Sequence, residues 1–313
     1  MTLVSKLKTA LKKKEVATLV ASVCLMAYSS GANAFACWTA AGAKISIGGG
    51  SADVYVNLTP SVGAGQNLVV DLSTQISCRN DYPGSHIDYV SISQGSSYGG
   101  ALKNFKGSLI YNSKSYPFPT TSTTDSITVL TNNMQPWPAK LYLTAIGSAA
   151  NGVAIDAGSL VAILNMHQEN NHNERADYVW NIYASNSVVV PTGGCDVSSR
   201  NVTVTLPDYP GTAAVPLTVH CGENQQLAYY LTGTTADTAS TIFTNTSSSN
   251  PATGVGVQLS NSNGIVATNK NVSLGTVGTS PQSLGLTASY ARTTGQVVAG
   301  NVQSIIGVTF VYE

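Results

Sequence analysis

The chain has 313 residues, of which only 10% are charged, and its 15 basic and 15 acidic side chains leave a formal net charge of zero. Five of the basic residues lie in the first 14 positions, and no basic cluster remains beyond them, which argues against nucleic acid or an anionic membrane as a partner. The length suggests two domains, because one domain usually takes roughly 100–200 residues.

The first 34 residues have the composition of a secretory signal peptide. Lysines at positions 6–14 precede an apolar run at residues 16–28, and Ala32-Asn33-Ala34 matches the Ala-x-Ala cleavage pattern. The apolar run is too short to span a bilayer, which takes about 20 apolar residues. We therefore expect an exported mature chain that starts at Phe35 and carries ten basic and fourteen acidic side chains.

Removal of the signal peptide takes Cys24 away and leaves an even number of cysteines: Cys37, Cys78, Cys195 and Cys221. In an exported chain this favours two disulfides over reactive thiols. Three pairings are open, and the local pairs Cys37–Cys78 and Cys195–Cys221 are the economical choice. Each would contribute roughly 3–4 kcal/mol by restricting the unfolded chain. The close CxxC spacing of a zinc site is absent.

Apolar segments along the mature chain alternate with a period of two, which predicts half-buried strands at residues 54–58, 141–144, 202–206 and 308–312. Turn-forming residues separate them at 80–84, 207–211 and 263–264. No segment sustains a helical stripe. Many short strands favour sandwiches or barrels, so we expect two all-β domains, at residues 35–190 and 195–313, joined by a Pro/Gly hinge at 191–194.

Two motifs could indicate catalysis or metal binding, and both are weak. Gly95-Ser96-Ser97-Tyr98-Gly99 fits the G-x-S-x-G pattern, but no helix is predicted after it, so a turn between strands is the favoured interpretation. His167 and His172 have acidic residues nearby, but their spacing matches neither H-E-x-x-H nor a structural zinc pattern. We expect no catalytic residue, no metal and no cofactor.

Two polar loops, at residues 80–88 and 168–174, combine carboxylates and amides with ring side chains. Carboxylates accept hydrogen bonds, amides both donate and accept, and rings cover apolar C–H patches, which together suit a sugar. Ordinary turn chemistry would produce the same composition and is the favoured interpretation on composition alone.

Several longer runs resemble the FimH family, the two-domain tip adhesins of type 1 fimbriae. The resemblance covers essentially the whole mature chain and is carried by Phe35-Ala36-Cys37 and by residues 54–58, 65–73, 80–83, 116–121, 189–196 and 300–308. It implies two β-sandwich domains: an elongated immunoglobulin-like or jelly-roll lectin domain, then an incomplete immunoglobulin-like pilin domain. It also implies binding of terminal α-D-mannose on host glycoproteins, at a fimbrial tip reached through the periplasm.

The resemblance also implies the site residues. The sugar would contact the α-amine of Phe35 and the side chains of Asn80, Asp81, Asp88, Gln168 and Asn170, inside a rim that includes Ile47 and Tyr82. Ammonium and carboxylate groups make charge-assisted hydrogen bonds worth about 1.5–3 kcal/mol each.

The chain departs from the family pattern at the rim and in the second loop. His86 and His172 stand where the family has an isoleucine and a second tyrosine, and protonation of these rim histidines would make binding depend on pH. The second loop is one residue shorter, so that Asp177 or Glu174 would supply the last carboxylate, and the floor phenylalanine has no clear equivalent.

For the second half, the resemblance implies a sandwich without its final strand. A periplasmic chaperone would fill the vacant groove, and an adjacent fimbrial subunit would later replace it during assembly at the outer-membrane usher. Gly300, Phe310 and Tyr312 would belong to this contact surface. The resemblance further implies that docking of the two domains loosens the pocket and that their separation tightens it.

Two other functions stay open. The altered second loop would suit a related tip adhesin for galactose-type sugars, although Gln168 and Asn170 favour mannose. A structural minor pilin without sugar binding would need neither the Phe35 start nor the acidic loop at residues 80–88. A secreted hydrolase ranks last, because no nucleophile or acid–base pair supports it.

Overall fold

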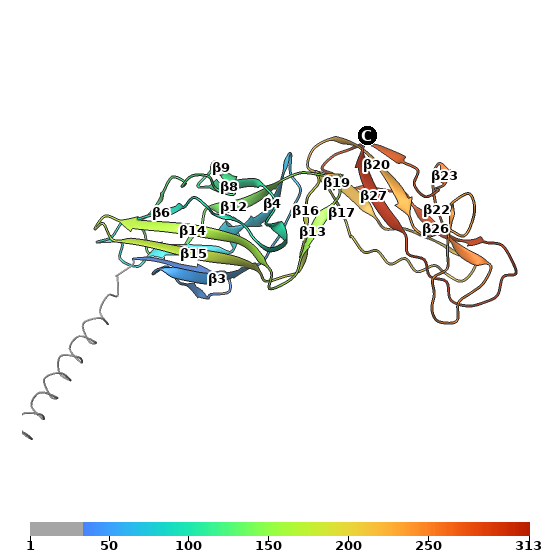
Figure 1. Cartoon of the computed structure of the whole chain (residues 1–313), viewed down its shortest axis with the longest axis horizontal. Helices are drawn as coiled ribbons and strands as arrows, with labels where there is room; N and C mark the ends of the chain where they lie inside the picture. Colours follow the sequence, from blue (N-terminus) through green and yellow to red (C-terminus); the bar gives the residue numbers. More distant parts are fainter. Residues whose placement is uncertain (1–33) are drawn as a thin grey trace, which may run out of the picture.

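The computed structural model describes residues 34–313, so the signal peptide predicted for residues 1–34 lies outside the described residues except for Ala34. Within the described part, the chain consists of β-strands with two short 3-10 turns, η1 (Leu72–Thr74) and η2 (Gly100–Leu102). None of the helices in this part is long and apolar enough to cross a membrane. The strands divide between two lobes (Figure 1), which confirms the predicted all-β fold.

The first lobe contains β1 to β16. Their bounds are β1 (Phe35–Thr39), β2 (Lys44–Ile45), β3 (Gly50–Val56), β4 (Gln66–Asp71), β5 (Ile76–Asn80), β6 (Asp88–Ile92), β7 (Ser97–Tyr98), β8 (Gly107–Tyr111), β9 (Lys114–Phe118), β10 (Ile127–Val129), β11 (Gln135–Pro136), β12 (Ala139–Thr144), β13 (Gly152–Ile155), β14 (Leu160–Asn170), β15 (Arg175–Ala184) and β16 (Val188–Pro191). The sheet orders are β11-β5-β1-β2, β10-β6-β14-β15-β3 with β7 on β14, β4-β12-β8-β9, and β13-β16.

The second lobe contains β17 to β27. Their bounds are β17 (Cys195–Val197), β18 (Thr212–Ala214), β19 (Thr218–Cys221), β20 (Gln225–Thr232), β21 (Ile242–Phe243), β22 (Val255–Asn261), β23 (Gly264–Ile265), β24 (Val272–Val277), β25 (Gln282–Ser283), β26 (Thr287–Arg292) and β27 (Gly307–Tyr312). The sheet orders are β17-β19-β25, β18-β26-β22-β21 with β23 on β22, and β24-β20-β27.

Each lobe has its own apolar core. In the first, alternate residues of β14 and β15 point inward, and the rings of Trp137 and Trp180 meet at a centroid distance of 5.5 Å. In the second, Tyr229 of β20 and Phe310 of β27 lie at the centre. The prediction that alternating segments form half-buried strands is therefore confirmed, because the alternation places one face of each strand against a core.

Both local disulfides are present. Cys37 of β1 lies directly opposite Cys78 of β5, and Cys195 of β17 lies directly opposite Cys221 of β19. Each disulfide therefore joins neighbouring strands within one lobe.

The strand predicted at residues 202–206 does not pair with any other strand of the described chain. Residues 202–206 alternate between half-buried and exposed positions, but they belong to no ladder. Val202, Val204 and Leu206 face a groove of the second lobe in which no neighbouring strand lies alongside them. The alternation gives the correct face, but the ladder is absent because the described chain supplies no strand to pair with this segment.

The junction between the lobes is held by specific hydrogen bonds. Asn67, fully buried, donates from Nδ2 to the carbonyl oxygens of Pro191 at 2.9 Å and Gly193 at 2.7 Å. The hydroxyl of Tyr312 accepts from the Gly194 amide at 2.8 Å. Ala149 and Ala150 of the first half pack in the core of the second lobe. The division at 190 and 195 stays a prediction, and the linker between these positions is fastened on both sides.

Candidate functional site

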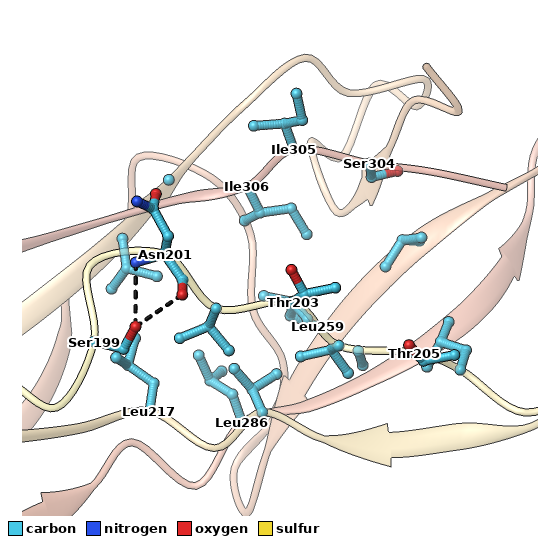
Figure 2. Close-up of a pocket in the computed structure, with 18 of the residues that line it drawn as sticks. Ser199, Asn201, Thr203, Thr205, Leu217, Leu259, Leu286, Ser304, Ile305 and Ile306 are labelled. Carbon is cyan, nitrogen blue, oxygen red and sulfur yellow. Dashed lines mark hydrogen bonds between the residues drawn. The ribbon is translucent and has the colours of Figure 1, made fainter. Parts of the chain in front are cut away.

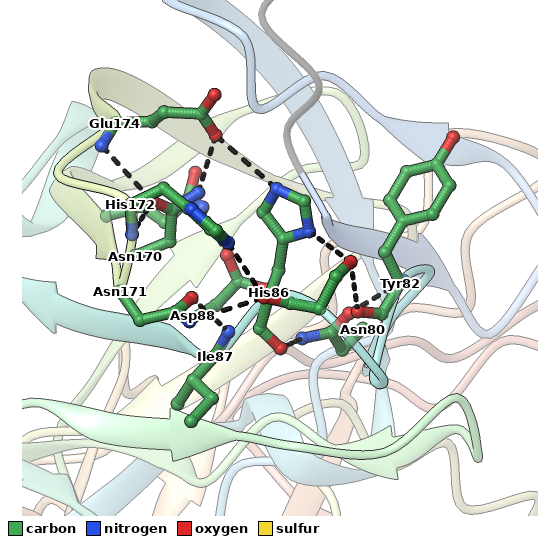
Figure 3. A network of polar contacts seen from close by, with 11 residues as sticks. Asn80, Tyr82, His86, Ile87, Asp88, Asn170, Asn171, His172 and Glu174 are labelled. Carbon is green, nitrogen blue, oxygen red and sulfur yellow. Dashed lines mark hydrogen bonds and ion pairs between the residues drawn. The ribbon is translucent and has the colours of Figure 1, made fainter.

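Four strand ends meet at the end of the first lobe that lies away from the second lobe (Figure 1). Phe35 at the start of β1 pairs with Asn80 at the end of β5, and Asp88 at the start of β6 pairs with Asn170 at the end of β14. The loop at residues 81–87 connects β5 to β6, and the hairpin loop at 171–174 connects β14 to β15. This register brings the two polar loops of the sequence analysis together (Figure 3).

The centre of the cluster is a buried pair, Asp88 and Gln168, which are 0% and 1% exposed. Gln168 Nε2 donates to Asp88 Oδ1 at 2.6 Å. The remaining oxygens, Asp88 Oδ2 and Gln168 Oε1, are buried and have no hydrogen-bond partner within the described residues. A buried acceptor without a partner costs about 1–3 kcal/mol. A ligand that supplies hydroxyl donors here would remove that cost.

The electrostatics of Asp88 reflect its burial. Burial raises the pKa of the Asp88 carboxyl above its ordinary value, and the carboxylate of Glu174 acts in the same direction. The hydrogen bond from Gln168 and the nearby His86 act in the opposite direction and favour the ionised form.

Asn80 shapes the first loop. Its Nδ2 donates to the carbonyl oxygens of His86 at 2.9 Å and Val129 at 3.1 Å, and its Oδ1 accepts from the Tyr82 amide at 2.7 Å. Val129 of β10 pairs with Asp88 of β6, so Asn80 and Asp88 both contact β10. The amide of Asn80 thus fixes the path of the loop.

Asn170 has the same role in the hairpin. Its Oδ1 accepts from the amides of His172 at 3.0 Å and Glu174 at 3.1 Å. Its Nδ2 donates to Glu174 Oε2 at 2.7 Å. The carboxylate of Glu174 is thereby held at the mouth of the cluster, where His86 Nε2 lies 3.8 Å away.

The predicted start of the mature chain, Phe35, lies next to the first loop, because Ala34 before it bonds to Asp81. The Phe35 ring is fully buried and packs on Trp137 at a centroid distance of 5.9 Å. The amide of Asp81 donates to the carbonyl oxygen of Ala34 at 2.6 Å, and its carboxylate pairs with Arg79 Nε at 2.6 Å. Ala34 is itself fully buried, so the residue before the predicted start occupies space beside the cluster.

The rim is a row of three rings. Tyr82 is 53% exposed, its ring lies 5.9 Å from that of His86, and the rings of His86 and His172 are 4.6 Å apart. Ile47 is 7% exposed and packs against the core, and its place on the rim stays a prediction.

Asp177 does not join the cluster. It lies directly opposite His167, and the two side chains form a hydrogen bond at 2.7 Å. Asp177 therefore shares a face of the sheet with His167. Gln168, the next residue on β14, points to the opposite face, where it bonds to Asp88. Asp177 thus faces away from Asp88. Glu174 is the carboxylate that the fold brings to the site.

Two contributors were missed by the sequence analysis, Ser85 and Asn171. Asn171 Oδ1 accepts from the Ile87 amide at 2.8 Å, and its Nδ2 donates to the carbonyl oxygen of Ser85 at 3.2 Å. These are contacts between side chain and backbone across two loops, and nothing in the composition of either loop signals them.

The two weak motifs have no catalytic geometry. The G-x-S-x-G segment contains the two-residue strand β7 and then η2, which is a single 3-10 turn and not the helix that a nucleophile elbow requires. Between residues 34 and 313, no group of three or more His, Cys, Asp or Glu side chains is arranged to hold a metal ion.

The second lobe contains an open groove of about 810 Å³ (Figure 2). One wall is the unpaired segment at residues 202–206, and the other is formed by residues 302–308 ahead of and within β27. Leu217, Leu259 and Leu286 line the floor. The groove thus has apolar side chains inside, and neither wall pairs with a strand on the side that faces the groove.

Of the three residues predicted to meet partner proteins, Gly300, Phe310 and Tyr312, only Phe310 is among the groove's lining residues. Phe310 is 5% exposed. Gly300 lies just before one wall, and a Cβ there would come within 2.5 Å of the Asn250 carbonyl oxygen, so the close approach requires glycine. Tyr312 turns toward the linker through its bond to Gly194.

Comparison with known proteins identifies related sequences for both halves. The family described as "FimH, mannose binding" matches residues 37–181, and the family described as "Fimbrial protein" matches residues 185–313. The "Type 1 fimbrin D-mannose specific adhesin" of Escherichia coli (strain K12) is 62% identical over 301 residues, which cover 96% of this chain and 100% of that protein.

A second relative is more distant. The "S-fimbrial protein subunit SfaH" of Escherichia coli O6:K15:H31 (strain 536 / UPEC) is 40% identical over 280 residues, which cover 84% of this chain and 92% of that protein. Among solved structures, the CupB6 tip adhesin from Pseudomonas aeruginosa matches 89% of this chain and 94% of its own, with 14% identity and a TM-score of 0.27. A TM-score this low supports no statement about a shared fold.

Proposed function

The chain belongs to the FimH family of fimbrial adhesins, and we propose that its first lobe binds terminal α-D-mannose on host glycoproteins while its second lobe anchors it at a fimbrial tip. It acts by binding and not by catalysis. One sugar in one site makes few contacts, so attachment of a cell relies on many fimbriae acting together.

The observation that carries this proposal is the buried pair Asp88 and Gln168 with two acceptor oxygens left free. A hexose presents adjacent hydroxyls that donate to such oxygens, and its other lone pairs accept from nearby amides. The proposed contact set is Phe35, Asn80, Asp81, Asp88, Gln168 and Asn170, with Glu174 in place of Asp177.

Signal-peptide cleavage would complete the site. With Ala34 removed, the Asp81 amide loses its 2.6 Å partner and the nitrogen of Phe35 becomes an ammonium group beside the acidic loop. That ammonium group would donate to sugar hydroxyls in charge-assisted bonds. Extension of the chain by Ala34 alone should therefore prevent binding.

The test is calorimetric titration of the processed chain, its start verified by mass spectrometry, with α-methyl mannoside and α-methyl galactoside. We expect binding of the mannoside, and a loss of about tenfold or more in Asp88→Asn, because a hydrogen bond to a charged group is worth about 1.5–3 kcal/mol. Asp53→Asn is the matched control, since Asp53 is exposed on β3 and bonded to Asn181.

Unchanged affinity in Asp88→Asn, with the control also unchanged, would remove Asp88 from the site. Binding of the galactoside instead would establish the alternative adhesin, and binding of neither sugar would favour the structural minor pilin. Thermal unfolding of each variant shows whether the fold is retained.

We further propose that the groove of the second lobe receives a strand from another protein. Its two walls offer unpaired backbone, and alternating apolar side chains point inward, which is the surface that strand addition uses. The partners would be a periplasmic chaperone first and an adjacent fimbrial subunit afterwards, with assembly at the outer-membrane usher. In this proposal the two lobes are domains at residues 35–190 and 195–313. The whole protein would be exported through the periplasm.

A further inference from the structure

The two loops of the sugar site are bonded directly to each other (Figure 3). Asn171 bonds to both Ile87 and Ser85, at 2.8 and 3.2 Å. His172 Nε2 lies 2.8 Å from the carbonyl oxygen of Ser85. Because a carbonyl oxygen only accepts, Nε2 must carry the hydrogen, and the imidazole acts as the donor.

The ring of His172 adds an apolar contact to this polar one. It packs against His86 at 4.6 Å, and His86 in turn bonds through Nδ1 to Ser85 Oγ at 2.7 Å and packs against Tyr82. The hairpin therefore holds the first loop through the Ser85 carbonyl oxygen, the Ile87 amide and the His86 ring, and the backbone amide of Asn171 also donates to the Ile87 carbonyl oxygen at 3.2 Å.

Few other bonds fix the outer part of the first loop. Within it, the amides of Ser85 and His86 donate to the Tyr82 carbonyl oxygen at 3.1 and 2.9 Å, which closes a turn without attaching it to the body of the lobe. Asn80 holds the base of the loop through the His86 carbonyl oxygen. The position of the turn thus depends on two sets of bonds, those from Asn80 to its two ends and those from the hairpin to Ser85 and Ile87.

We propose that Asn171 and His172 form an inter-loop latch, two positioning residues that hold the 82–87 loop in place over the buried Asp88–Gln168 pair before any ligand binds. The sugar side of this inference rests on the proposed function. A latched loop keeps the site in the conformation that binds the sugar. The apparent affinity falls in proportion to the fraction of molecules in that conformation.

The experiment measures hydrogen exchange of the backbone amides of residues 82–87 in the processed full chain without ligand, and then calorimetric affinity for α-methyl mannoside. The variants are His172→Phe, which keeps a ring but loses the donor, His172→Gln, which keeps a donor, and Asn171→Ala. His167→Phe is the matched control, because His167 lies on β14, the strand that leads into the hairpin, but faces away from the site and bonds to Asp177.

We expect His172→Phe and Asn171→Ala each to speed exchange of the loop amides several-fold and to weaken mannoside binding by about two- to tenfold, the range for one lost hydrogen bond. His172→Gln should restore part of both effects, and His167→Phe should leave both unchanged.

Wild-type exchange in both His172→Phe and Asn171→Ala would overturn the latch. Weaker binding with wild-type exchange would also overturn it, because His172 would then act by touching the ligand. Should the wild-type chain bind no mannoside, the sugar function fails, but exchange in the absence of ligand still decides the latch.

Discussion

At the scale of single residues, Asp88 is the group whose protonation state matters most for the proposed binding. Both of its oxygens are free to accept hydrogen bonds only when the group is an ionised carboxylate. Burial raises the pKa of this carboxyl. The titratable groups facing it are His86 of its own loop, Glu174 of the hairpin, Tyr178 of β15 and, after cleavage, the amino group of Phe35.

We therefore expect mannoside affinity to fall on acidification with a midpoint above about 3.9, the value of an ordinary aspartate. The measurement is calorimetric affinity of the processed chain across the acidic range. Asp88→Asn removes the titrating group, so its weaker affinity should lose this acid limb. An acid limb that persists unchanged in Asp88→Asn would assign the titration to another group.

The same raised pKa affects stability with the opposite sign. The folded chain binds the Asp88 proton more tightly than the unfolded chain does. Its contribution to stability is therefore fully present below the unfolded pKa and is lost as the pH rises through the folded pKa. The ionised carboxylate that the sugar needs is thus held at the expense of stability.

At the scale of elements, the segment at residues 202–206 and strand β27 form the two sides of one incomplete structure. β27 pairs with β20 on one side only, and its other side faces the groove. Val204 is half-buried there and alternates with exposed neighbours. An open edge with an apolar face is a ready template for an added strand.

We expect an extended synthetic peptide of alternating apolar and polar residues to raise the unfolding temperature of the full chain, because a ligand that binds only the folded state stabilises it. Val204→Asp should abolish this shift by placing a charge in the groove. Val298→Asp is the matched control, since Val298 is 52% exposed and lies outside the groove lining. An equal shift in wild type and Val204→Asp would contradict strand addition at this groove.

At the scale of the whole molecule, the linker is a fastened segment and not a free hinge. Asn67 holds two of its carbonyl oxygens, and a Cβ at Gly222 of the second lobe would come within 2.4 Å of the Gly63 backbone. The two lobes are therefore in backbone contact beside the linker. Coupling between the lobes requires that separated and docked states differ in intrinsic affinity for the sugar.

We expect Asn67→Ala to release the linker, since it leaves two buried carbonyl oxygens without their donor, at about 1–3 kcal/mol each. Hydrogen exchange at residues 192–194 should increase. Mannoside affinity should rise toward that of isolated residues 35–190, if the docked state is the weaker binder as the family resemblance implies. Equal affinities of the full chain and the isolated residues would show that the lobes are not coupled.

Much of the fold and part of the site could be predicted from the sequence, because both depend on local patterns. Period-two alternation places β12 and β27 correctly, and the economical pairing of four cysteines is confirmed. Family resemblance led to Asp88 and Gln168 as candidates. Residues 202–206 show the limit, since alternation reports which face is apolar but not whether a partner strand exists.

The sequence by itself determined which residue types stand in the two polar loops and which strands are half-buried, because alternation and turn chemistry act between neighbours in the chain. Only the tertiary structure decided that Glu174 and not Asp177 faces the site, that Ile47 is buried, and that two oxygens of Asp88 and Gln168 stay free. The first and last of these outcomes depend on the register of β6, β14 and β15, where a shift of one residue would turn every side chain to the opposite face.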